Sequence, residues 1–154
     1  HMLYHVPDAQ AAVFEFARVL VPDGHALVVL NANAHMCEIR QLHLDAMADL
    51  AGATYLLPAR ASERWTIETA QPILAAAFDV LHCARVTREL VIPDAEPVVD
   101  YANSMQSFYA PFLPVDVTWA TLMERMRGRV EATIASDGAW RCHSDVGCFV
   151  CRAR

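Results

Sequence analysis

The chain begins with HMLYHVPD at residues 1–8 and continues, after an apolar segment, into VPDGHALVVLN at residues 21–31. Asp8 can cap a helix, because apolar residues recur at helical spacing between positions 9 and 20. The turn residues before position 25 end that helix. Residues 25–31 then form an uninterrupted apolar run, which is typical of a strand buried on both faces. This succession of loop, helix, turn and buried strand predicts an α/β fold.

Periodicity predicts further elements in the rest of the chain. Residues 54–68 lack a regular period, which indicates a loop. We expect Thr69 to cap the helix after this loop, with Pro72 tolerated in its first turn. The other predicted helices and strands follow the same criteria. The helices are 34–50, 69–78, 97–109 and 118–135, and the strands are 78–92, with alternating exposure, and 139–152.

The order of these elements resembles the C-terminal half of a class I S-adenosylmethionine-dependent methyltransferase that acts on small molecules, similar to methyltransferase type 11. In that family a loop much like residues 1–8 follows the fourth strand, and a helix and a turn then lead into the fifth. The resemblance covers essentially the whole chain, and the order of the elements carries it. It implies a partial Rossmann-like methyltransferase fold.

The resemblance also implies the topology of the sheet. The last strand of the family inserts antiparallel between the fifth and sixth strands. We therefore expect a remnant three-stranded mixed sheet, flanked by helices that pack on its faces. The expected strand order is 25–31, 139–152, 78–92, and the flanking helices are 9–20, 34–50 and 69–78.

The glycines of the chain bear on the cofactor. The family binds S-adenosylmethionine with a glycine-rich turn between a strand and a helix, because only glycine lets the backbone approach the ligand closely. S-adenosylmethionine is thus the cofactor of the complete family fold, but we expect none to bind this chain alone. The five glycines are too far apart in sequence for such a turn: Gly24, Gly52, Gly128, Gly138 and Gly147.

Composition narrows the class of protein. Hydrophobic residues make up 55% of the 154 residues, above the roughly 45–50% of an ordinary soluble domain. The longest uncharged stretches, such as residues 25–37, fall short of the roughly 20 apolar residues of a membrane span. The net charge is −6 and the 12 basic residues are scattered, which disfavours nucleic acid as a partner. Without a cleavable leader, we expect a cytoplasmic protein with no membrane contact.

The cysteines suggest a metal site only weakly. Cys142, His143, Cys148 and Cys151 are the one cluster with zinc-binding residue types. Residues 139–152 are predicted as a strand, however, and residues three apart in a strand point to opposite faces. We therefore expect these cysteines to act as small buried apolar residues, and no metal to bind.

The resemblance selects candidate catalytic residues by position. Residues after the fourth strand lie beside the transferring methyl group in the family, which makes His5 a candidate catalytic base and His1 and Tyr4 candidates for cofactor contact. A histidine can accept a proton from a hydroxyl or amine near neutral pH. The alternative is that His5 only anchors the helix start at Pro7 and Asp8, as local polar groups often do.

Candidate substrate-binding residues lie at the end of the 25–31 strand and in the helical segment. We treat 1–154 as a single domain, in which the segment near 94–135 resembles the substrate lid of small-molecule methyltransferases. Asparagines at the carboxyl edge of a strand can bind ligands or satisfy loop backbone. Aromatic residues of a lid can bind an aromatic or polyketide-like substrate, or simply form its core. The candidates are Asn31, Asn33, Tyr101, Tyr109 and Trp119.

Three functions remain open from the sequence. The first is a methyltransferase represented by its C-terminal half. The second is a truncated methyltransferase-like protein with a cofactor-independent activity, such as a cyclase or hydrolase. The third is a non-catalytic interaction subunit. The coding sequence upstream of Met2 separates them, because an in-frame glycine-rich strand, turn and helix favours the first, whereas a stop codon favours the others.

The 25–31 strand also predicts a partner. In the family its far edge pairs with the fourth strand, which the chain lacks. This apolar edge carries no Lys, Pro or charged residue that would oppose pairing. We therefore expect a homodimer, or a complementing chain, through the edge of residues 25–31, besides a small-molecule substrate.

Overall fold

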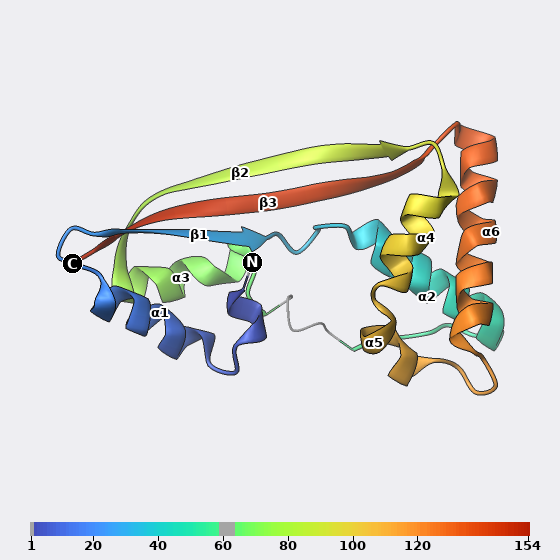
Figure 1. Ribbon diagram of the computed structural model, residues 1–154, viewed down its shortest axis with the longest axis horizontal. Helices are drawn as coiled ribbons and strands as arrows, with labels where there is room; N and C mark the ends of the chain where they lie inside the picture. Colours follow the sequence, from blue (N-terminus) through green and yellow to red (C-terminus); the bar gives the residue numbers. More distant parts are fainter. Residues whose placement is uncertain (1, 59–63) are drawn as a thin grey trace. The chain divides into compact units, whose positions relative to one another are not determined.

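The computed structural model describes residues 2–58 and 64–154. Figure 1 shows its helices and strands coloured from blue at the N-terminus to red at the C-terminus. The predicted strands are confirmed within about one residue at each end: β1 spans His25–Asn31, β2 Phe78–Ile92 and β3 Trp140–Ala153. The helices are η1 (Leu3–His5), α1 (Ala9–Val19), α2 (Cys37–Ala51), α3 (Ile67–Ala77), α4 (Ala95–Asn103), α5 (Gln106–Tyr109), η3 (Ala110–Phe112) and α6 (Trp119–Asp137).

The three strands form one sheet in the order β1-β3-β2, which is the order expected from the resemblance. β3 pairs antiparallel with β1, in a register that runs from His25 opposite Arg152 to Asn31 opposite Val146. The arrows in Figure 1 show that β2 also runs opposite to β3. The expectation of a mixed sheet was therefore wrong for these strands. β1 and β2 run in the same direction, but β3 separates them, so no parallel pair forms.

Contacts divide the described residues into two compact units. The sheet unit comprises residues 2–35, 64–88 and 144–154, and the helical unit comprises residues 36–58 and 89–143. β2 and β3 each contribute residues to both units. The single domain over residues 1–154 stays a prediction.

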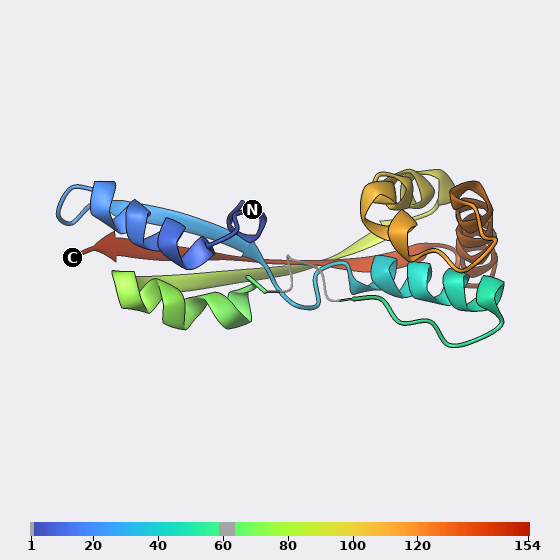
Figure 2. The same ribbon diagram turned by 90° about the horizontal axis from the view of Figure 1, so that it is seen from below.

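In the sheet unit, α1 and α3 pack side by side on one face of the sheet (Figures 1 and 2). The core between them and the strands includes the fully buried Val13, Leu74 and Phe149. On β1 the buried Leu30 alternates with Leu27, which is 69% exposed. The predicted packing of helices 9–20 and 69–78 on the sheet is confirmed, and the helix predicted at 34–50 belongs to the helical unit.

The helical unit has a core of its own. Apolar side chains of α2, α4 and α6 meet there, among them Met47, Val98 and Met126, all of them almost fully buried. The helix predicted at 34–50, observed as α2, belongs to this core. Trp140 and Cys142 from the first residues of β3 pack into the same cluster. Among the described residues, no helix combines the length and apolarity needed to span a membrane.

The helix limits agree with the prediction in part. The helix predicted at 97–109 is two helices, α4 and α5, and α2 begins at Cys37 rather than at residue 34. Asp8 caps α1 as predicted, since its carboxylate accepts a hydrogen bond from the backbone N–H of Ala11 at 2.8 Å. α3 instead begins earlier than predicted, because Thr66 and Thr69 form a reciprocal capping box in which Thr66 is the N-cap. Thr69 is therefore the third helical residue rather than the cap, and Pro72 lies inside α3, beyond its first turn.

The pattern of buried and exposed side chains along the two long strands, β2 and β3, was not predicted. β2 was expected to alternate, but the side chains from Leu81 to Val91 are exposed, because the packed helices reach this edge strand mainly near Phe78. On β3 the buried positions change parity along the strand. Cys142 is buried in the helical unit, whereas Asp145 and Phe149 are buried in the sheet unit.

Candidate functional site

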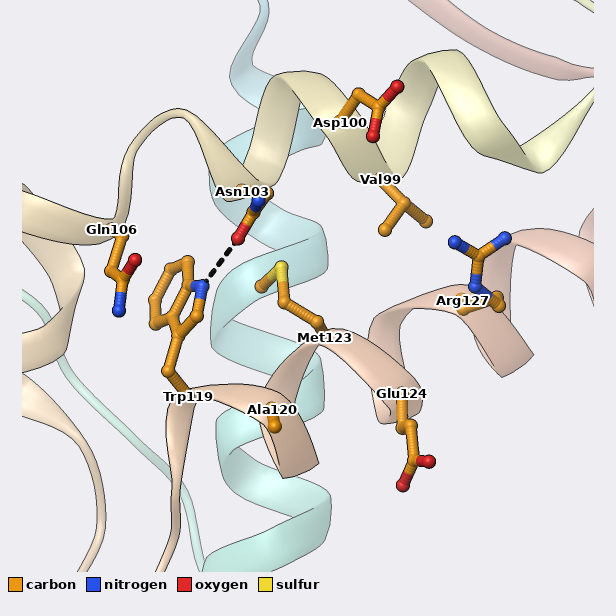
Figure 3. A pocket seen from close by; sticks show the side chains of 9 residues that line it. All are labelled: Val99, Asp100, Asn103, Gln106, Trp119, Ala120, Met123, Glu124 and Arg127. Atoms are coloured by element: carbon orange, nitrogen blue, oxygen red, sulfur yellow. Dashed lines mark hydrogen bonds between the residues drawn. The ribbon is translucent and has the colours of Figure 1, made fainter.

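A pocket in the helical unit is the candidate site (Figure 3). Its volume is about 590 Å³, within the roughly 300–1,000 Å³ that small-molecule sites occupy. Helices α4 and α6 form its walls and α5 one end. It is lined by Val99, Asp100, Asn103, Gln106, Trp119, Ala120, Met123, Glu124 and Arg127.

Helix periodicity explains why these side chains converge. Trp119, Met123 and Arg127 follow one another at steps of four along α6, which places them on one face of the helix. The start of α6 is fixed by Thr118, whose hydroxyl accepts a hydrogen bond from the backbone N–H of Thr121 at 3.1 Å. Trp119 is thus the first residue of α6, and the capped helix start fixes its backbone. Its ring lines the pocket.

Two polar contacts order the pocket. The indole Nε1–H of Trp119 donates to the side-chain oxygen Oδ1 of Asn103 at 2.7 Å, the dashed line in Figure 3. At the other end, Nη1 of Arg127 donates to Oε2 of Glu96 at 2.6 Å. This hydrogen bond raises the pKa of Arg127 and lowers the pKa of Glu96, so both groups stay charged. Arg127, the cation in the pocket lining, is therefore already paired with Glu96.

The predicted aromatic substrate residues have three different surroundings. Trp119 is half-buried and lines the pocket. Tyr101, on α4, is 40% exposed and does not line it. Tyr109 is buried, and its ring stacks on the ring of His43 with centroids 3.9 Å apart. Only Trp119 among them faces this cavity, and the substrate-binding roles of all three stay predictions.

The predicted asparagines lie in the sheet unit. Asn31 is the last residue of β1, and the backbone N–H of Asn33 donates to Oε2 of Glu68 at 3.1 Å. Glu68 also approaches Arg85, with Oε1 3.4 Å from Nη2. A charged cluster therefore lies near the end of β1, and the substrate-binding roles of Asn31 and Asn33 stay predictions.

A buried aspartate is the centre of that cluster, and the sequence analysis missed it. Arg85 donates from Nε and Nη2 to the two carboxylate oxygens of Asp145, at 2.8 and 2.5 Å, and Thr87 donates its hydroxyl at 3.1 Å. The backbone N–H of Asp145 donates to Nδ1 of His35 at 3.0 Å. The hydrogen bonds from Arg85 keep the pKa of Asp145 below its usual range. The partners lie about 60 and 110 residues away, so no local motif could have revealed them.

Tyr4 and His5 line a second cavity, of about 290 Å³, in the sheet unit. Their rings are tilted against each other with centroids 4.4 Å apart. Arg64 and Trp65 form the opposite wall. The start of α1 is capped by Asp8 itself, so His5 is not its N-cap. His1, the other residue predicted to contact a cofactor, lies outside the described residues.

No metal centre is apparent in the described part of the chain, where no group of three or more His, Cys, Asp or Glu side chains could hold an ion. Cys151 is buried and Cys148 half-buried on β3. The ring Nδ1 of His143 instead lies 2.6 Å from Oε1 of Glu38, in the helical unit. The absence of zinc stays a prediction.

The glycines of the chain do not fit a cradle for S-adenosylmethionine. A Cβ at Gly24 would lie 2.7 Å from the carbonyl oxygen of Val21, so this glycine serves the turn before β1. A Cβ at Gly147 would lie 2.6 Å from Ile67, so this one serves the packing of α3 on β3. The remaining glycines have nothing within 4 Å of such a Cβ. None of the five glycines thus marks a glycine-rich cradle, and the expectation that this chain alone binds no S-adenosylmethionine stays a prediction.

Comparisons with known proteins show a likeness of fold. No protein-family model matches the sequence, and no curated protein matches it. The structure superposes on that of a protein from Bacillus halodurans C-125, described as a "putative methyltransferase", with a TM-score of 0.51 and 16% identity, over 98% of this chain and 60% of that chain. For the MccD protein the TM-score is 0.43 and the identity 13%, over 99% and 57%. The chain thus spans about 60% of the length of these structures, and the likeness to the first concerns the fold alone.

Proposed function

We propose that this chain is the C-terminal part of an S-adenosylmethionine-dependent methyltransferase and that its helical unit binds a small-molecule methyl acceptor. The observation that carries the proposal is the fold likeness over 98% of the chain to a protein described as a "putative methyltransferase". The pocket between α4 and α6 supports the second part, because small-molecule sites are cavities of this size with apolar walls and a few polar groups.

The roles of individual residues follow from the two cavities. S-adenosylmethionine supplies the methyl group to the complete enzyme, and residues outside those described here hold it. The helical unit binds and orients the acceptor, which is the main contribution a protein makes to a displacement reaction. In the sheet unit His5 is the proposed general base of the reaction, and Tyr4 lines the same cavity as His5.

The test begins with the coding sequence. If the reading frame continues upstream of Met2 into a glycine-rich strand, turn and helix, the complete chain is expressed and incubated with S-adenosylmethionine and a panel of aromatic phenols and amines. The expected result is S-adenosylhomocysteine released in proportion to methylated acceptor. A stop codon directly upstream, or a complete chain that methylates none of the panel, counts against the proposal.

The role of His5 is tested in the same complete chain. His5→Ala should lower the rate of methyl transfer by roughly 10²–10⁴-fold, the usual effect of removing a general base. His25→Ala, which changes an exposed histidine of β1, is the matched control and should keep the rate. A His5→Ala chain that is folded by circular dichroism and retains the full rate would assign His5 a structural role instead.

A further inference from the structure

The pairing of β1 with β3 ends in an irregular way. The register that closes with Asn31 opposite Val146 places Ala32 opposite Asp145. In a hydrogen-bonded position of an antiparallel pair, each residue donates its N–H to the carbonyl oxygen of the other. Ala32 does donate to the carbonyl oxygen of Asp145, at 2.9 Å, but its own carbonyl oxygen accepts from the backbone N–H of His35, at 3.1 Å. The backbone N–H of Asp145 therefore needs another acceptor.

The imidazole of His35 supplies that acceptor. The backbone N–H of Asp145 donates to Nδ1 of His35 at 3.0 Å. A backbone N–H can only donate, so Nδ1 carries a lone pair, and the proton of the neutral ring is on Nε2. Asp145 is almost fully buried, so leaving its N–H without an acceptor costs free energy. His35 thus bonds to β3 only while its ring is neutral.

Protonation of His35 removes this bond. A proton from the solvent binds the lone pair of Nδ1, and the imidazolium then has an N–H on both ring nitrogens and no acceptor. The new N–H would face the backbone N–H of Asp145, so the ring has to turn away from it. Histidine is the side chain whose charge ordinarily changes between pH 5 and 8, so this step falls near neutral pH.

Charged groups on three neighbouring elements act on the imidazolium. On β2, the hydrogen bonds from Arg85 are the main reason that the pKa of Asp145 is low, and the charge of His35 contributes to it. On β3, the Asp145 carboxylate attracts the imidazolium, but both of its oxygens are bound to Arg85. On α3, Glu68 approaches Arg85 and accepts from the backbone N–H of Asn33. The imidazolium is therefore attracted by carboxylates that already have partners, and not by the N–H that binds the neutral ring.

We infer that His35 is a pH-sensitive switch that joins the end of β1 to β3 when its ring is neutral and releases it when the ring is protonated. Release leaves the buried N–H of Asp145 without its acceptor and loosens the turn at residues 32–35. That turn contains Asn33, one of the predicted substrate-binding residues. The inference goes beyond the proposed function and does not depend on it.

Two NMR measurements on this chain between pH 5 and pH 8 test the switch. The ¹⁵N shifts of the His35 ring should show an unprotonated Nδ1 and a protonated Nε2 at pH 8, and His35→Asn identifies these signals among the seven histidines. The hydrogen-exchange protection of the Asp145 amide, corrected for the intrinsic effect of pH, should fall about three- to tenfold as His35 takes up its proton. This is the effect of losing one ordinary hydrogen bond.

Three variants separate the switch from a general effect of pH. In His35→Asn the side-chain oxygen can take the place of Nδ1 and accepts at every pH, so the protection of the Asp145 amide should stay high from pH 5 to pH 8. In His35→Leu no acceptor remains, so the protection should be low and independent of pH. His25→Asn, at an exposed position of β1 in the same unit, is the matched control and should behave like the unaltered chain.

A proton on Nδ1 at pH 8 would overturn the inference, as would a His35 ring that stays neutral down to pH 5. Protection of the Asp145 amide that stays constant while His35 titrates would also overturn it. So would protection that falls as steeply in His35→Asn as in the unaltered chain, because another group, such as His143 beside Glu38, would then be responsible. If His35→Leu does not fold, the ring shifts and the His35→Asn comparison still decide.

Discussion

Asp145 of β3 and Arg85 of β2 form a two-pronged ion pair, with both guanidinium nitrogens Nε and Nη2 donating to the carboxylate of an almost fully buried aspartate. Such bidentate pairs are the strongest charge-assisted hydrogen bonds in proteins. The pair joins the two strands at the end of β1, where Ala32 also donates its backbone N–H to the carbonyl oxygen of Asp145 at 2.9 Å. The Asp145 side chain thus joins β2 to β3, and its backbone holds the residue that follows β1.

The first prediction concerns the stability of the fold at acidic pH. The hydrogen bonds from Arg85 lower the pKa of Asp145 in the folded chain, so the stabilisation is present above the unfolded pKa of an aspartate, about 4, and is lost as the pH falls through the lower folded value. Asp145→Asn should therefore lower the melting temperature at pH 7 and flatten its decrease below pH 4. Differential scanning calorimetry between pH 2.5 and 7 measures both, and an unchanged acid profile would show that the pair contributes nothing.

The second prediction concerns neutral pH. The hydrogen bond with Glu38 raises the pKa of His143. The pair therefore stabilises the fold fully at pH values below the pKa of histidine in the unfolded chain, about 6.5. This stabilisation is lost as the pH rises through the pKa of His143 in the folded chain. The melting temperature should fall between pH 6 and pH 9, and His143→Gln should remove that part of the fall. His82→Gln, at an exposed position of β2, is the control. Equal pH profiles for the two variants would contradict the prediction.

The third prediction uses two glycines in opposite surroundings. Gly147→Ala should destabilise the chain by about 1–3 kcal/mol, because its Cβ would lie 2.6 Å from Cδ1 of Ile67 and 3.3 Å from the carbonyl oxygen of Ala84. Gly128→Ala, in the middle of α6 with nothing near its Cβ, should stabilise it by about 0.5–1 kcal/mol. Urea unfolding of both variants measures the change in the free energy of unfolding that each substitution causes. Changes of the same sign in the two variants would count against the packing of Ile67 on β3.

The fourth prediction concerns the cofactor. Isothermal titration calorimetry of this chain with S-adenosylmethionine should show no binding tighter than millimolar. Four of the five glycines serve a turn, helix ends or packing, and Gly128 lies inside α6, so none belongs to a glycine-rich turn between a strand and a helix. A micromolar dissociation constant would mean that the chain has a cofactor site of another kind.

The fifth prediction concerns the partner. β1 lies at one edge of the sheet, and an apolar edge strand tends to pair with another strand. We propose a homodimer in which two copies of β1 pair about a two-fold axis. Leu27, 69% exposed, is the position to test, since Val28 is buried and its replacement would disturb the core. Leu27→Lys should convert the dimer to a monomer by light scattering, and Leu56→Lys, at a residue 85% exposed, should not. A wild-type monomer at micromolar concentration would refute the dimer.

Much of the local structure could be predicted because it depends on neighbours in sequence. The apolar run at 25–31 and the turn at Gly138 gave correct strand limits, and Asp8 gave a correct helix start. The start of α3 was missed because Thr66 and Thr69 are both good caps, and only the reciprocal hydrogen bonds select Thr66.

What was missed depends on tertiary contacts. The exposure of β2 from Leu81 to Val91 arises because the helices of the sheet unit pack against this strand mainly near Phe78, which the alternation of its side chains does not record. Of the residues that line the α4–α6 pocket, only Trp119 was predicted. The polar groups around it, such as Asn103 and Arg127, come together only when α4 packs against α6, and the sequence does not show that contact. The Asp145 cluster joins segments that are distant in sequence, and single-sequence patterns carry no such information.

The change of buried parity along β3 restricts how this sequence can vary in evolution. Cys142 and Asp145 are both buried, although an uninterrupted alternation would expose one of them. Deleting or inserting a single residue between them would turn every later side chain of the strand over, exposing Phe149 and Cys151 and burying Arg152. The two residues between Cys142 and Asp145 therefore set which face of the rest of β3 is buried, and the fold requires that their number stay the same.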